Sequence, residues 1–205
     1  MTAMKSLGLI AILGLIPTAA TAAPPIASGS YADALLIGYE PATKTLTGYF
    51  DMQRGEAPSF SCIFYLEGTM AQAASGHLRT YFPKTPASDL IEGRLEAQSP
   101  TTFWLALKAE HGGCMNVEPF ADGANPADFQ LDAPYPWTSV RVVKAAKAYF
   151  YAAPAAAEHG RTYVVQGDGL GVRARQGGWL KADYVGGEKP VSGWVREEDL
   201  YPAAH

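Results

Sequence analysis

The sequence predicts an all-β protein, in which an N-terminal antiparallel meander, folded as a barrel or sandwich, is followed by a small second barrel. Short apolar runs rich in Val, Tyr, Phe and Trp recur along most of the chain, and Gly, Asp and Pro close them. The connections between the runs have hairpin length. Where a period is clear, it is the two-residue alternation of strands.

The first 22 residues have the pattern of a secretory signal peptide. Lys5 is their only charge, and the apolar run Leu7–Ile16 ends at Pro17, before small residues at 20–22. This run is about half of the ~20 residues that a membrane-spanning helix needs, so a retained anchor is the less favoured alternative. We expect residues 23–30 to be a flexible lead-in.

Residues 31–143 are expected to form the first domain, with about eight strands. Strands at 34–39 and 45–50 are joined by a short turn and predict a hairpin. Alternation is clearest at 90–97, where Ile91 and Leu95 share one face and charged side chains occupy the other, as in a half-buried antiparallel strand. The remaining strands are expected at 60–66, 78–82, 101–108, 129–131 and 137–143.

Residues 144–202 predict a second, smaller domain. The runs RTYVVQ, LGVRAR, WLKADYV and SGWVREEDL are each short and follow one another with turns between them. We interpret the Ala-rich segment 152–157 as a long loop after an opening strand at 149–151. The boundary near 142–146 leaves almost no linker, so the two domains are expected to pack closely.

Cys62 and Cys114 are the only cysteines. In an exported protein an even pair predicts a disulfide, here closing a loop of about fifty residues and stabilising the fold by about 4 kcal/mol. A zinc site built on His111 and Cys114 is the alternative, but no second pair lies at ligand spacing. We therefore expect no metal and no cofactor.

The charge balance excludes one class of partner. The chain has 16 Lys and Arg against 20 Asp and Glu, and residues 23–143 alone hold 7 against 13. This balance predicts no strongly basic face, so binding to a phosphate backbone lacks its main driving force. Nucleic acid is not an expected partner, and after the signal peptide no segment is long and apolar enough to span a membrane.

The sequence does not predict an enzyme. None of the four histidines lies in a nucleophile motif, and no Gly-x-Ser-x-Gly occurs. An enzyme of unrecognised type centred on Glu110, His111 and Cys114 remains an alternative, and it requires the thiol of Cys114 to be free.

The second domain resembles the bacterial SH3-like (SH3b) domains. The residues that carry the resemblance are Tyr149-Phe150-Tyr151 with Pro154, Tyr163-Val164-Val165 before Gly167-Asp168, Gly178-Trp179-Leu180, and Gly193-Trp194-Val195 before Asp199-Leu200. Three segments of the first domain, 46–49, 60–64 and 110–114, look like those of exported bacterial proteins that carry such a domain. That second likeness implies an architecture and no activity.

The resemblance implies a binding module without catalysis, whose partner is peptidoglycan or another peptide or protein of the cell envelope. In such barrels aromatic rings line a surface groove, and rings with a polar edge suit flat sugar faces or extended peptides. The candidate groove residues are Tyr149, Tyr151, Trp179 and Tyr184. The expected location is the periplasm, or outside the cell.

The first alternative to this function, ahead of the unrecognised enzyme, is an exported inhibitor or immunity-type protein that covers another protein's active site. The acidic residues of the first domain suit a basic target of this kind. The three hypotheses thus differ in which residues matter: the rings of the second domain, the acidic first domain, or the Glu110–Cys114 segment.

Overall fold

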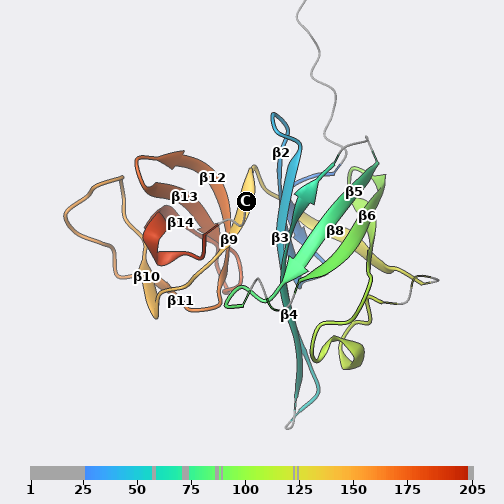
Figure 1. The fold of residues 1–205 in the computed structure, drawn as a ribbon. Helices are drawn as coiled ribbons and strands as arrows, with labels where there is room; N and C mark the ends of the chain where they lie inside the picture. Colours follow the sequence, from blue (N-terminus) through green and yellow to red (C-terminus); the bar gives the residue numbers. More distant parts are fainter. Residues whose placement is uncertain are drawn as a thin grey trace, which may run out of the picture.

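The structure is a computed structural model that describes residues 26–56, 59–70, 74–85, 88, 90–121, 123 and 125–202. The expected signal peptide lies outside these residues. The chain is all-β, as predicted, and Figure 1 shows two units of strands side by side. Within the described ranges, no helix has the length and apolarity needed to cross a membrane.

The first unit is a closed barrel of eight antiparallel strands that follow one another in chain order. A one-turn 3-10 helix, η1 (Cys114–Asn116), lies in the connection between its last two strands. The strands are β1 (Gly29–Tyr31), β2 (Leu35–Glu40), β3 (Thr45–Arg54), β4 (Phe60–Thr69), β5 (Ser75–Tyr81), β6 (Ile91–Ser99), β7 (Thr102–Leu107) and β8 (Ala127–Pro134).

The barrel is closed by β1, which the sequence pattern did not predict. β1 pairs with β2 on one side and with β8 on the other. Ile26 is fully buried, and the backbone N–H of Ala27 donates to the carbonyl of Pro100. The expectation of a flexible lead-in over 23–30 is therefore corrected for residues 26–30. Without β1, the strands β2 and β8 would each have an unpaired edge. β1 pairs with both and so closes the barrel.

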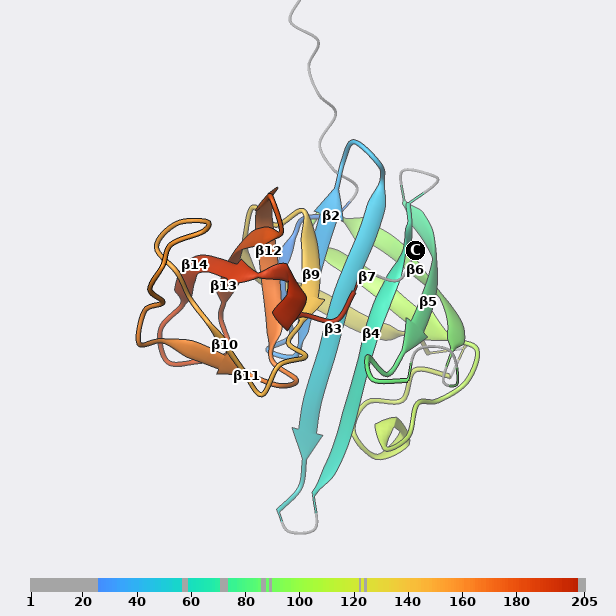
Figure 2. The same ribbon diagram turned by 60° about the vertical axis from the view of Figure 1, so that its left-hand side comes forward.

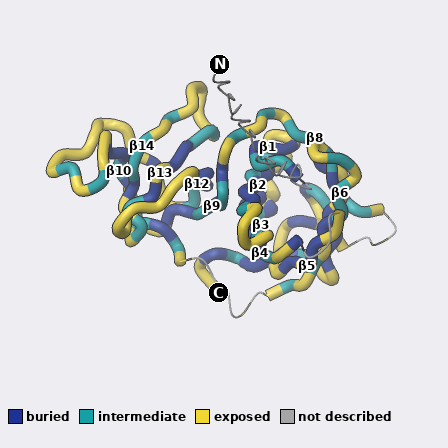
Figure 3. The backbone as a smooth tube through the Cα atoms, turned by 90° about the horizontal axis from the view of Figure 1, so that it is seen from above, coloured by how far each residue is buried: buried dark blue, intermediate teal, exposed yellow. Residues whose placement is uncertain are grey.

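Aromatic rings fill the barrel interior. Phe50 stacks on Phe64 with 5.2 Å between ring centroids, and both rings meet the edge of Phe120. Phe129 meets the ring of Phe50 edge to face and stacks on Phe103, which extends the cluster. All five side chains are buried, so the interior is a packed core. Seen from above, the buried residues line the inside of both units (Figure 3).

The second unit holds six strands in two sheets. A four-stranded sheet has the order β14-β13-β12-β9, and a two-stranded sheet pairs β10 with β11. Its core is mainly aliphatic, with Val143, Leu170, Leu180, Val195 and Leu200 among its members. The elements are β9 (Ser139–Val142), β10 (Lys147–Tyr149), β11 (Tyr163–Val165), β12 (Gly169–Gln176), β13 (Trp179–Tyr184), β14 (Val191–Arg196) and the 3-10 helix η2 (Glu197–Asp199).

The strand expected at 137–143 belongs to the second unit and not to the barrel. β9 is hydrogen-bonded to β12, with Val140 opposite Gly171. The break between the units therefore lies between Pro134 and Ser139, several residues before the expected boundary at 143/144. Strand spacing shows that a strand exists, but it does not show which sheet the strand joins.

β9 also lies against the outer face of the barrel, across β2 and β3 (Figure 2). It is an edge strand, so one side of its backbone has no strand partner. The Val140 N–H donates to Oγ1 of Thr47 at 2.8 Å, and the hydroxyl of Tyr65 donates to the Val140 carbonyl at 2.8 Å. Burial raises the pKa of Tyr65, which keeps its hydroxyl protonated as a donor. Barrel side chains thus satisfy both backbone groups of Val140 on the open edge of β9.

Trp137, in the chain segment before β9, packs on the four-stranded sheet of the second unit. The indole is 1% exposed, and its Nε1–H donates to Oδ2 of Asp183 at 2.7 Å. A Cβ at Gly171 would lie 2.0 Å from the indole ring, so only glycine permits this approach. Gly38 on the barrel permits a similar close approach of β9, because a Cβ at this position would lie 2.5 Å from the backbone of Ser139.

We predict that Thr47→Val lowers the free energy of unfolding by about 1–3 kcal/mol, because it leaves the buried N–H of Val140 without an acceptor. Urea unfolding measures the change. Thr45→Val is the control, since the Thr45 hydroxyl donates to the exposed hydroxyl of Thr43 and not to buried backbone, and we expect a change within about 0.5 kcal/mol. Equal effects of the two substitutions would contradict the role of Thr47.

Candidate functional site

Five aromatic side chains form a continuous row on the outside of the second unit. The centroids of Tyr163 and Tyr149 lie 5.6 Å apart, and His159 stacks on Tyr149 at 3.9 Å. Tyr151 follows, with its ring 6.0 Å from His159 and 4.8 Å from Trp179. We call these residues the aromatic row. Three of the four candidate groove residues belong to it.

Strand alternation places the row outside the core. Along the segment containing β10, Ala148 and Phe150 point into the core and are buried, while Tyr149 and Tyr151 point the other way. Tyr163 on β11 lies directly opposite Tyr149 in the strand register. On β13, Trp179 precedes the buried Leu180 and so lies on the opposite face. Strand periodicity therefore accounts for four of the five rings of the row, and His159 joins them from a loop.

A cation lies over each end of the row. Nζ of Lys147 is 4.3 Å from the centroid of the Tyr163 ring. The guanidinium carbon of Arg196 lies 5.5 Å from the Tyr151 centroid and 5.7 Å from that of Trp179. Cations in these positions are attracted to the negative faces of the rings and hold them in place.

The rings of the row differ in exposure, and this divides their roles. Tyr151 is only 7% exposed, so it supports its neighbours and offers little surface of its own. Tyr163 is 43% exposed, His159 is exposed, and Tyr149 and Trp179 are half-buried. The surface available to a ligand therefore comes from these last four residues.

Tyr184 lies apart from the row. It lines a cavity of about 340 Å³ between the two units, together with Tyr49 of the barrel and Tyr135 of the connection. Three carboxylates line the same cavity: Asp33, Asp51 and Asp168. The structure thus brings together Tyr149, Tyr151 and Trp179 and separates Tyr184 from them.

The carboxylates of this cavity affect one another. Partial burial raises the pKa of Asp51, and the nearby Asp168 carboxylate raises it further. Burial also raises the pKa of Tyr184, again with a contribution from Asp168. Native structure therefore disfavours the charged form of Asp51.

A broad depression with a mixed, mainly basic lining adjoins the row at Trp179. Its cavity volume is about 810 Å³. Arg141, Lys144, Arg175 and Arg196 contribute to its lining, as do Glu197 and Glu198. The charge balance of the sequence predicted no strongly basic face, but the fold gathers four of the cations at one place. Composition could not reveal this, because the gathering depends on how β9, β12 and β14 are arranged.

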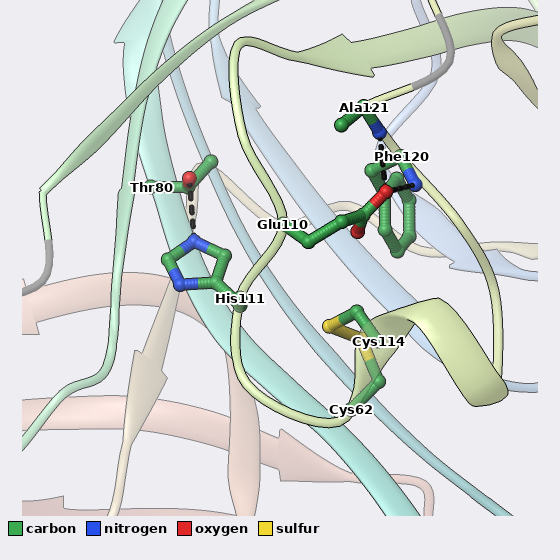
Figure 4. The surroundings of a disulfide bond; sticks show 7 residues. All are labelled: Cys62, Thr80, Glu110, His111, Cys114, Phe120 and Ala121. Carbon is green, nitrogen blue, oxygen red and sulfur yellow. Dashed lines mark hydrogen bonds between the residues drawn. A yellow bond between two sulfur atoms is a disulfide. The ribbon is translucent and has the colours of Figure 1, made fainter.

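The side chains of the Glu110–Cys114 segment are held by a disulfide, hydrogen bonds and a ring contact within the protein (Figure 4). Cys114 is bonded to Cys62, as predicted, and both are fully buried. Oε1 of Glu110 accepts hydrogen bonds from the N–H groups of Phe120 and Ala121. Nε2 of His111 lies 2.8 Å from the hydroxyl of Thr80, and the imidazole stacks on Phe64.

This arrangement does not favour the alternatives that depend on Cys114. Its sulfur is in a disulfide and is not available as a nucleophile or as a metal ligand. Among the described residues, no group of three or more His, Cys, Asp and Glu side chains could hold a metal ion. The disulfide instead ties η1, which follows β7, to β4 across the end of the barrel.

Two members of the aromatic row were not among the candidate groove residues. Tyr163 could have been found by pairing the expected strands, because it lies opposite Tyr149 in the register. His159 carries no such signal, since it belongs to the long loop, where sequence alone predicts an exposed side chain. Its contact with Tyr149 depends on how that loop folds back over the rings.

Comparison with protein-family models, with curated proteins and with solved structures finds no match for this chain.

We predict that replacing both cysteines, Cys62→Ala with Cys114→Ala, lowers the free energy of unfolding by about 2–4 kcal/mol, because the unfolded chain regains the freedom of a long loop. Urea unfolding of the variant and of the reduced wild-type protein should give the same lowered midpoint. An unchanged midpoint in both would show that the bridge adds no stability.

We also predict that Asp51→Asn stabilises the protein at pH 7. The native pKa of Asp51 is raised above its ordinary value of 3.8, so wild-type stability falls as pH rises through the window between these two values. The variant lacks this loss, and its advantage should vanish below pH 3.8. Urea unfolding midpoints of the wild type and the variant, measured at pH 7 and at a pH below 3.8, test this prediction.

The control for Asp51→Asn is Asp128→Asn, which removes an exposed carboxylate on β8 and measures the general effect of one charge. If both variants gain the same stability at pH 7, the burial of Asp51 and its interaction with Asp168 are not the cause of the gain.

Proposed function

We propose that the protein is an exported, non-enzymatic binding protein. Its second unit, an SH3-like module, recognises a peptide or glycan of the bacterial cell envelope through the aromatic row. The signal-peptide pattern of the first 22 residues and the Cys62–Cys114 disulfide support export, since such bridges persist in oxidising compartments. Periplasmic location is part of the same proposal.

The observation that carries the proposal is the division of apolar side chains in the second unit. Its core consists of aliphatic side chains and Phe150, and no residue of the row belongs to that core. The rings of Tyr149, Tyr163 and Trp179 are therefore not needed to fill the interior. Large aromatic side chains held rigidly at a surface are typical of recognition sites.

The chemistry of the row suits the proposed ligand class. Tyrosine, histidine and tryptophan combine a flat apolar face with a polar edge, so they can stack on a sugar ring or on an extended peptide and also form hydrogen bonds. The contacts of Lys147 and Arg196 with the outer rings limit their motion before a ligand arrives. A surface that is already ordered loses less entropy on binding.

The test is a pull-down on purified cell-wall sacculi. We predict that the wild-type protein is retained and that Trp179→Ala weakens retention about tenfold or more, because truncating an aromatic anchor costs about 2 kcal/mol. Trp104→Ala is the matched control, since Trp104 is also exposed, at 41%, but lies on the barrel. It should bind as the wild type does.

Two outcomes would contradict the proposal. Failure of the wild-type protein to bind would remove wall recognition and favour a protein partner, in line with the inhibitor or immunity-type alternative. Equal losses in Trp179→Ala and Trp104→Ala would show that the row is not the binding surface. Thermal unfolding of both variants checks that each is folded.

A further inference from the structure

The depression beside Trp179 has features that specify the charge of its ligand. Arg141, Lys144, Arg175 and Arg196 contribute four positive charges to its lining, against two negative charges from Glu197 and Glu198. At about 810 Å³, it is within the size range of sites for small ligands. Trp179 lines it and also ends the aromatic row, so one ligand can contact both.

The four cations are not equally available. Arg141 is largely buried, with its side chain 12% exposed, and it donates from Nε and Nη2 to the carbonyl of Tyr201. The side chain of Arg175 is 70% exposed and that of Arg196 is 47% exposed. Lys144 is also exposed. Arg141 therefore has a structural role, and the other three can turn toward a ligand.

The exposed guanidinium groups already bind carboxylates within the protein. Nη2 of Arg175 is 2.9 Å from Oε2 of Glu197, and Nη1 of Arg196 is 3.6 Å from Oε1 of Glu198. The side chain of Glu198 is 74% exposed, so its long contact with Arg196 contributes little stability and is readily exchanged. A ligand carboxylate can take its place, and the planar guanidinium can bind it through two parallel hydrogen bonds.

We propose that this depression binds the carboxylate groups of an acidic peptide, whose apolar portion lies on Trp179. This inference rests on the proposed function, because it assigns the peptide of the envelope as the ligand and gives its charge. Arg175 and Lys144 bind the carboxylates without touching the aromatic row. Arg196 serves both parts, since it lies over the rings of Tyr151 and Trp179 and also lines the depression.

The test uses the full-length mature protein and three preparations of purified sacculi: untreated, amidated at their carboxyl groups, and stripped of phosphate polymers by acid. We expect retention on untreated and phosphate-stripped sacculi, and at least about tenfold weaker retention after amidation. Raising the salt concentration should weaken binding to the untreated sacculi, because these charges are exposed. Loss of binding after phosphate removal, with amidated sacculi still bound, would overturn the inference in favour of a phosphate ligand.

Variants separate the two proposals. Arg175→Gln with Lys144→Gln should weaken binding to untreated sacculi about tenfold and have little effect on the weak binding to amidated sacculi. Arg94→Gln, an exposed arginine of the barrel, is the control and should change nothing. Glu198→Gln removes the competing carboxylate and should strengthen binding about two- to threefold, a gain that a damaged fold could not produce.

If untreated and amidated sacculi retain the wild-type protein equally, and Trp179→Ala weakens its binding to both preparations, the acidic-peptide inference fails and the proposed function stands. If no preparation of sacculi retains the wild-type protein, the tripeptide Glu-Glu-Glu is titrated into the protein to about 10 mM. The indole N–H signal of Trp179 is followed by NMR. A shift that its triamide does not reproduce supports the depression as a carboxylate site. No shift overturns it.

Discussion

The open edge of β9 is the constraint on which the rest of the structure depends. An edge strand exposes backbone donors and acceptors that must find partners when they are buried. Here β12 satisfies one side of β9, and the side chains of Thr47 and Tyr65 satisfy Val140 on the other. Tyr49, Tyr65 and Tyr81 on the barrel are buried with β9 in one cluster, so the two units share a core.

The second unit separates two uses of aromatic residues that usually compete. Small domains need large side chains to fill a small interior, and recognition surfaces need the same side chains on the outside. In this chain the aliphatic residues and Phe150 fill the interior, and the aromatic row lies outside it, with four of its five rings offering surface. The basic depression begins where that row ends, at Trp179, so an apolar surface and a charged one meet at a single side chain.

The sequence predicted most strands, because two-residue alternation and turn residues are local properties. It predicted the disulfide because the chain has two cysteines and begins with the pattern of a signal peptide, and such a pair is usually oxidised in exported proteins. It could not predict that Gly29–Tyr31 closes the barrel, since this strand is short and lacks an apolar run. It also could not assign β9 to the second unit or separate Tyr184 from Trp179, because these depend on contacts between distant segments.

The double membership of β9 has a consequence for how the chain can be divided. A fragment that starts after Val143 would lack the strand that covers β12, and the exposed backbone of β12 would be open to pairing with another molecule. Such a fragment invites aggregation, whereas one that starts near Tyr135 keeps its own edge strand but exposes the face that Tyr49 and Tyr65 cover in the intact protein. Neither of these two fragments therefore keeps all the contacts that β9 makes in the intact protein.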